Sequence, residues 1–217
     1  IESTIPPGTT TDIVLPILET CGLLGGSDFY LAHCPERVLP GMILEELLHN
    51  SRIIGGINRA SSDKAADLYR SFSTGTIYCT NSKTAELVKL SENTFRDVNI
   101  ALANELASIA ADVGSNVWET IELANKHPRV NILSPGPGVG GHCIPIDPWF
   151  LINTLQRSSG IISKAREIND LQPKQTVRQI LGLLGDCPNP KVALLGAAYK
   201  ADISDSRESP AISIIEE

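Results

Sequence analysis

Short apolar runs alternate with helical patterns over the first 80 residues of the chain. The apolar runs predict strands at residues 1–5, 29–34, 52–56 and 75–79. Between them, apolar residues recur at helical spacing over residues 9–20 and again over residues 61–72. Strands that alternate with helices are typical of a parallel α/β layer, which is the architecture that we expect for this part of the chain.

From Ser82 the apolar period becomes helical and continues to Gly114. This predicted helix is longer than the usual three or four turns and has a wide apolar face, which is typical of a domain spine or a dimer seam. Further helices are predicted at residues 117–125, 146–155 and 163–184, with a break at Ser158–Gly160 and a kink or junction at Pro173. After a linker at Cys187–Pro190, the apolar run 191–196 predicts a buried strand that opens another α/β unit.

The rest of the chain is organised around the stretch Gly136–Pro148, where glycines and prolines surround one cysteine and one aspartate. Glycine allows positive φ and close approach to a ligand, and proline removes N–H donors, so this stretch predicts a shaped loop that presents Cys143. A helix should begin near Asp147, and its N-terminal dipole would favour the thiolate. Asp147 would then lie one helical turn from Cys143. The alternative is a structural loop around an inert, buried cysteine.

Two further pairs of polar residues are candidates for chemistry. Lys89 and Asn93 are four residues apart in the long predicted helix, so both could donate hydrogen bonds to one oxyanion. Glu36 and Arg37 follow the predicted strand 29–34, at the edge of an α/β sheet where ligands sit. The alternative for Lys89 and Asn93 is an exposed Lys and Asn on the helix surface. The alternative for Glu36 and Arg37 is a solvated turn.

Basic residues gather at two other places. Lys126–Arg129 could hold an anionic ligand or could form a solvated loop. Lys200 and Arg207 follow the predicted strand 191–196 and would suit a phosphate. His142 lies next to Cys143, but no second Cys or His pair is near, so no metal site is expected.

Composition narrows the class of protein. The net charge of −7 and the pI near 5.1 argue against a nucleic-acid partner. No apolar run approaches the roughly 20 residues of a membrane span, and no signal peptide is recognisable. Five cysteines without a C-x-x-C pair indicate reduced thiols, so we expect a cytoplasmic location.

Taken together, the motifs resemble those of the UDP-glucose/GDP-mannose dehydrogenase family. The motifs that carry the resemblance lie at residues 3–10, 34–41, 85–97, 127–132, 136–143 and 199–210. They cover almost the whole chain and keep the family's order. The resemblance implies the end of a Rossmann-like NAD domain at 1–81, a central all-helical dimerisation domain at 82–186, and the start of a second Rossmann-like, UDP-binding domain at 187–217. The chain contains no G-x-G-x-x-G loop, and both ends look cut, so we expect a fragment of a longer protein.

The resemblance also implies an activity and roles for residues. The family oxidises the C6 alcohol of a nucleotide sugar to a carboxylate with two NAD⁺, through a thiohemiacetal and a thioester on the residue matching Cys143. Lys89 and Asn93 would stabilise oxyanions, while Thr4, Glu36 and Asp147 would hold or activate water. Residues implied in substrate binding are Arg37, Arg96, His127, Arg129, Gly140, Tyr199 and Lys200. Thr4 and Arg207 would contact NAD, and His127 and Arg129 could reach a site in the partner subunit of a homodimer.

One departure from the family pattern bears on the substrate. The UDP-glucose enzymes carry a second glutamate four residues after the position of Glu36, where this chain has Pro40. This form resembles the branch that acts on UDP-N-acetyl-D-mannosamine. UDP-glucose, UDP-N-acetylglucosamine and GDP-mannose remain alternative substrates, and a dimerisation and binding module without turnover is the alternative for this chain alone. A cysteine hydrolase is disfavoured because none of the four histidines has a triad context.

Overall fold

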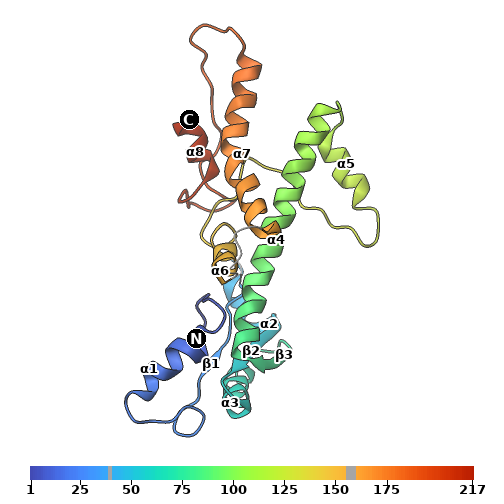
Figure 1. The fold of residues 1–217 in the computed structure, drawn as a ribbon. Coiled ribbons are helices and arrows are strands. Elements are labelled where there is room, and N and C mark those ends of the chain that lie inside the picture. The colour runs from blue at the N-terminus through green and yellow to red at the C-terminus, as the bar shows by residue number, and fades with distance from the viewer. Residues whose placement is uncertain (39–40, 155–159) are drawn as a thin grey trace. The chain divides into compact units, whose positions relative to one another are not determined.

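The computed structural model describes residues 1–38, 41–154 and 160–217. Contacts divide the chain into two compact units, Ile1–Glu92 and Asn93–Glu217, and each is described by itself (Figure 1). Pro40 and most of the predicted break at Ser158–Gly160 lie outside the described residues, as does Leu155 at the end of a predicted helix.

A three-stranded sheet forms the centre of the first unit, in the order β1 (Ala32–His33), β2 (Arg52–Gly56), β3 (Ile77–Asn81). Strands β2 and β3 are parallel, as expected, because the twelve-residue helix α3 (Arg59–Arg70) provides the crossover between them. Strand β1 is antiparallel to β2, so the prediction of a wholly parallel layer is wrong. The helix between them, α2 (Ile43–His49), is short and buries no residue, so it does not form a crossover packed on the sheet.

The predicted strand at residues 1–5 is not formed as a strand, although Ile1 and Glu2 make backbone hydrogen bonds to β1 and the residues after it. The N-terminal nitrogen of Ile1 donates to the Ala32 carbonyl, and the Cys34 N–H donates to the Ile1 carbonyl, both at 2.7 Å. A helix follows, as predicted: a π-helical segment η1 (Thr9–Val14) continues into α1 (Leu15–Glu19). The small core beneath the sheet contains Cys34, Ile54, Ala66 and Tyr69.

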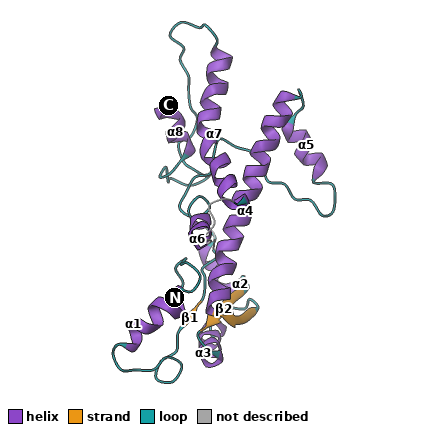
Figure 2. Ribbon diagram, in the orientation of Figure 1, coloured by secondary structure: helices purple, strands orange, loops and turns teal. Residues whose placement is uncertain are grey.

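Helices make up the second unit, and Figure 2 shows all three strands outside it. The long predicted helix is confirmed as α4 (Ser82–Asp112), which begins in the first unit. The others are α5 (Val117–Ala124), α6 (Asp147–Thr154), α7 (Ile161–Leu184) and α8 (Pro210–Glu216). Pro173 lies inside α7 without dividing it, so Pro173 marks no junction between two helices. Among the described residues, no helix is long and apolar enough to cross a membrane.

The predicted buried strand at residues 191–196 is not formed. No described residue pairs with this segment, and its side chains are exposed, Leu195 by 95%. A strand needs a neighbour to satisfy its backbone N–H and C=O groups, so an apolar run alone does not produce one.

His33 in β1 predicts an acid-sensitive first unit. Its side chain is fully buried, and neither ring nitrogen has a hydrogen-bond partner among the described residues. Burial lowers the pKa of His33, and the nearby Glu86 charge only partly opposes this effect. The folded state therefore takes up a proton on His33 at a lower pH than the unfolded state, whose His33 has its ordinary pKa of about 6.5. Stability is present above that pH and is lost as the pH falls from it towards the lowered pKa, by at most about 1.4 kcal/mol per pH unit.

Urea unfolding between about pH 7.5 and about pH 5.5 measures this loss, and we expect His33→Gln to flatten the pH dependence. The exposed His49 supplies the control variant His49→Gln, which should keep the wild-type slope. An unchanged slope in His33→Gln would contradict the assignment.

Candidate active site

The loop that carries Cys143 ends in helix α6, as its sequence predicts. Asp147 is the first residue of α6, and its backbone N–H donates to the Cys143 carbonyl at 2.9 Å. This bond closes one helical turn between the two residues. Cys143 itself is exposed, so the burial that the alternative interpretation assumed for this cysteine is wrong.

Helix α4 brings an amide to the end of this loop. The Asn93 Nδ2 donates to the Asp147 Oδ2 at 2.6 Å, and both side chains are buried, 8% and 3% exposed. Lys89 lies four residues earlier in α4 and is half-buried, so it is not the freely solvated lysine of the alternative interpretation. This bond uses one of the two hydrogens on the Asn93 Nδ2.

The chain's own C-terminal segment covers the glycines of the loop. A side chain at Gly141 would place its Cβ 2.7 Å from the Tyr199 ring, and one at Gly140 would lie 2.6 Å from the Glu208 carbonyl oxygen. Both distances are too short for real contacts, so these two positions exclude every residue with a Cβ unless the neighbours move. From the sequence we expected the glycines to allow a ligand close to the backbone. In the structure the absence of a Cβ instead allows Tyr199 and the segment before α8 to lie close to Gly140 and Gly141.

Asp205 links the same segment to the loop. Its carboxylate accepts hydrogen bonds from the Arg207 guanidinium at 3.0 and 2.8 Å and from the Arg207 backbone N–H at 3.0 Å, and it lies 3.5 Å from the His142 Nε2. Arg207, followed by the weaker effect of His142, holds the pKa of the Asp205 carboxyl well below its usual range. The guanidinium of Arg207, which the sequence assigned to the cofactor, is thus engaged by a carboxylate.

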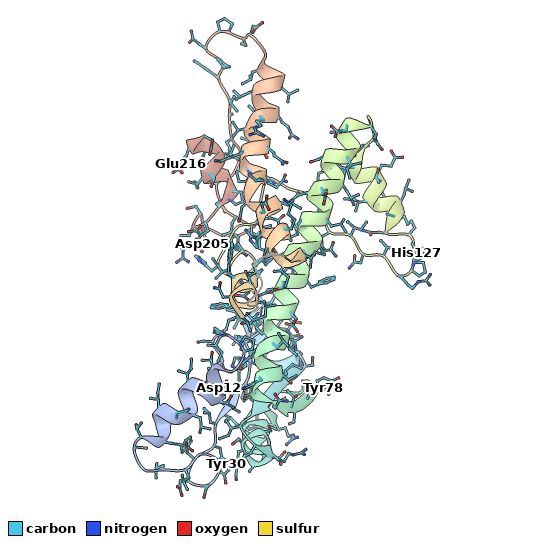
Figure 3. The ribbon with its side chains drawn as sticks, viewed as in Figure 1. Asp12, Tyr30, Tyr78, His127, Asp205 and Glu216 are labelled. Carbon is cyan, nitrogen blue, oxygen red and sulfur yellow. The ribbon has the colours of Figure 1, made fainter. Side chains whose placement is uncertain are left out.

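The remaining predicted residues of the second unit lie on its surface. Arg96 on α4, His127 and Arg129 after α5, and Lys200 are exposed, while Tyr199 is half-buried. Figure 3 shows His127 well apart from Asp205, which contacts the neighbour of Cys143. Within this unit the structure therefore brings Cys143, Asn93 and Asp147 together, and it does not add His127 or Arg129 to them.

Charged residues after β1 are paired in the first unit. Arg37 binds Glu92 through two hydrogen bonds of 3.1 and 2.7 Å and also donates to the Ser51 carbonyl. Glu36 is half-buried, and its Oε2 lies 3.5 Å from the Nη1 of Arg52. The Glu36 and Arg37 side chains are therefore both ion-paired while remaining partly exposed to solvent. Thr4 is half-buried in the segment that precedes η1.

Two buried charged residues of the first unit, Glu86 and Arg52, were not identified from the sequence, although they hold the segments around Thr4 and Glu36. Glu86 on α4 accepts hydrogen bonds from the Gly8 and Thr10 N–H groups, at 2.5 and 2.8 Å, and so fixes the turn that follows Thr4. Arg52 is 5% exposed beneath Glu36. The available signal was a charge inside an apolar pattern, since Glu86 falls between the buried Ala85 and Leu90.

A second set of missed residues joins α4 to α7. Arg166 donates to the Asp97 Oδ1 at 2.5 Å and also to Asp170, and Asn169 donates to Asp97 at 2.9 Å. Asp97 and Arg166 are 0% and 2% exposed. Among the described residues, no group of three or more His, Cys, Asp or Glu side chains could hold a metal ion.

Two family models match this chain. Residues 1–73 match the NAD binding domain of the UDP-glucose/GDP-mannose dehydrogenase family, and residues 83–171 match the central domain of the same family. The chain belongs to the UDP-glucose/GDP-mannose dehydrogenase family, and the resemblance inferred from its motifs is confirmed.

Individual relatives are similar over the whole chain. A UDP-N-acetyl-D-mannosamine dehydrogenase of Methanocaldococcus jannaschii is 55% identical over 99% of this chain and 48% of its own length. The solved UDP-D-ManNAc dehydrogenase of Pyrococcus horikoshii has a TM-score of 0.94 at 52% identity, covering 100% of this chain and 53% of that one. A UDP-glucose dehydrogenase of Pyrobaculum islandicum has a TM-score of 0.86 at 28% identity, covering 99% and 50%. This chain spans about half the length of the curated relatives it matches.

The buried pair Asp97–Arg166 predicts a large stability effect. Burial raises the pKa of Asp97, while Arg166 and Asn169 favour its charged form. Arg166→Leu removes the countercharge, so we expect it to cost about 3–5 kcal/mol in the free energy of unfolding at neutral pH. The loss should shrink as the pH falls, because protonation of Asp97 then removes the unpaired charge.

Urea unfolding of Arg166→Leu against Arg178→Leu tests this expectation, since Arg178 is an exposed arginine of the same helix α7. The double variant Asp97→Asn/Arg166→Leu should recover part of the loss. Equal stability of the two single variants would contradict the role of the pair.

Proposed function

We propose that this chain is part of an NAD-dependent nucleotide-sugar 6-dehydrogenase that oxidises UDP-N-acetyl-D-mannosamine to the uronate through Cys143. The observation that carries the proposal is the arrangement at the start of α6. There an exposed thiol is one turn from a buried carboxylate that is itself held by an amide of α4. A nucleophile beside a fixed acid and amide donors is suited to covalent capture of an aldehyde.

The choice of sugar rests on the relatives. Identity of 52–55% over the whole chain links it to proteins named for UDP-N-acetyl-D-mannosamine, whereas the UDP-glucose relative is 28% identical. Pro40 in place of a glutamate supports the same choice.

The residues of this chain have the following roles in the proposed reaction. After the C6 alcohol has become an aldehyde, the Cys143 Sγ forms a bond to C6, and the carbonyl oxygen gains a proton to give a thiohemiacetal. Loss of hydride from C6 and of the proton from its hydroxyl leaves a thioester, and attack by water then breaks the C–S bond, which releases the carboxylate and the thiol. Bound NAD⁺ would supply the hydride acceptor for both oxidations. Asn93 and Lys89 donate hydrogen bonds to the oxygen anions, and Asp147, Glu36 and Thr4 hold or deprotonate water.

Only some of the residues needed to hold NAD⁺ are in this chain. Thr4, which would contact the cofactor, lies just before the turn that Glu86 fixes. The chain has no G-x-G-x-x-G loop, so no pyrophosphate contact is assigned to its residues. Arg207 would have to leave Asp205 before it could reach a cofactor.

The nucleotide sugar would be held by residues from several segments. These are Arg37, Arg96, His127, Arg129, Gly140, Tyr199 and Lys200. The domain boundaries 1–81, 82–186 and 187–217 and the homodimer belong to the same proposal. Helix α4 supports the dimer, because Phe95, Leu102 and Ile109 are exposed at intervals of seven residues and so lie along one face.

A substrate panel on the full-length protein tests the proposed function. We expect UDP-N-acetyl-D-mannosamine to yield about two NADH per sugar, as a four-electron oxidation requires. Cys143→Ser should lower kcat by at least about a thousandfold, since it removes the covalent route. Cys187→Ser, at another exposed cysteine, is the matched control and should retain activity. Turnover of UDP-glucose but not of UDP-N-acetyl-D-mannosamine would overturn the substrate, and no turnover of any sugar would favour the binding module.

A further inference from the structure

Helix α4 carries a row of buried polar side chains in the second unit, Asn93, Asp97 and Asn104, which we call the α4 polar stripe. Their side chains are 8%, 0% and 2% exposed. Spacings of four and seven residues place all three on one face of the helix. Buried polar groups are costly unless they are hydrogen-bonded, so such a row indicates specific partners.

Asn104 holds the start of the Cys143 loop. Its Oδ1 accepts a hydrogen bond from the Gly136 N–H at 2.9 Å, and its Nδ2 donates to the Asn169 Oδ1 at 3.0 Å. Asn169 on α7 is oriented in turn, because its Nδ2 donates to both the backbone and the side-chain oxygen of Asp97 at 2.9 Å. Each amide thus fixes the direction of the next, from Asp97 through Asn169 and Asn104 to Gly136.

Asn93 holds the other end of the same loop. It donates to Asp147 at 2.6 Å, and the Asp147 N–H donates to the carbonyl of Cys143. Asn93 and Asn104 are eleven residues apart, which is about 16 Å along a helix. One rigid helix therefore sets the positions of both ends of the loop that presents the thiol.

We propose that Asn104 and Asn169 are positioning residues for the reaction at Cys143. They touch neither the thiol nor, in the proposed function on which this inference rests, the substrate. They act through the Gly136 backbone, which they hold at a fixed place relative to Asn93. A shift of about 1 Å in a reacting group can cost on the order of a hundredfold in rate, so loss of this anchor should appear in catalysis.

The variant Asn104→Ala in the full-length enzyme tests the proposal. We expect kcat to fall about 10–100-fold while KM for the nucleotide sugar stays within about threefold, because the thiol is displaced while, of the proposed binding residues, only Gly140 lies in the same loop. The matched control is Asn116→Ala. Asn116 caps α5 by accepting from the Trp118 N–H at 2.9 Å, so its loss also removes an Asn–backbone hydrogen bond from the second unit. Equal kinetic effects in the two variants would overturn the proposal, as would a rise in KM with unchanged kcat.

Two measurements without substrate separate this inference from the proposed function. Hydrogen exchange resolved to single residues in the wild-type protein should show the Gly136 amide exchanging at least about tenfold more slowly than that of Gly138. Similar rates would overturn the anchor even if Asn104→Ala failed to fold. Iodoacetamide labelling of Cys143, with the exposed Cys187 as internal reference, should change in Asn104→Ala and not in Asn116→Ala. If the wild-type enzyme oxidised no nucleotide sugar, the proposed function would fail while these two measurements still decided the anchor.

Discussion

The hydrogen bond between Asn93 and Asp147 and the Asp97–Arg166 pair belong to one buried polar system on α4. Burying these groups has a high cost in free energy unless each finds its partner, so α6, α7 and the Cys143 loop have few acceptable positions around the helix. The same bonds that satisfy the buried groups place an exposed thiol one turn from a carboxylate. In the second unit the same buried side chains therefore stabilise the fold and, in the proposed reaction, position the reacting groups.

Local signals in the sequence predicted much of this arrangement. The apolar period from Ser82 predicted α4, and the stretch with its glycines, prolines and Asp147 predicted both a loop that presents Cys143 and the start of α6. These features depend on residues close together in the chain, where glycine, proline and helix periodicity act directly. The motif order likewise predicted the family, which the family models confirm.

Features set by distant contacts were not predictable. The antiparallel direction of β1 is set by its pairing with β2, about 20 residues later in the chain, and the run at 191–196 needs a neighbouring strand that an apolar pattern cannot supply. Gly8 and Thr10, which Glu86 binds, and Asp97, which Arg166 binds, lie more than 60 residues away in the chain, so the sequence shows only a charge among apolar positions. The glycines at 140 and 141 admit Tyr199 and Glu208, which a local analysis could not distinguish from a ligand.

The central claim is that Cys143 bonds covalently to the C6 carbon of the sugar. The most direct measurement is mass spectrometry of the full-length Lys89→Ala enzyme, quenched during reaction with UDP-N-acetyl-D-mannosamine and NAD⁺, because loss of an oxyanion donor should slow breakdown of the intermediate. The account predicts a sugar-nucleotide adduct on the peptide that contains Cys143 and on no other cysteine. Turnover to the uronate without an adduct in either this variant or the wild type, and with activity retained in Cys143→Ser, would contradict it.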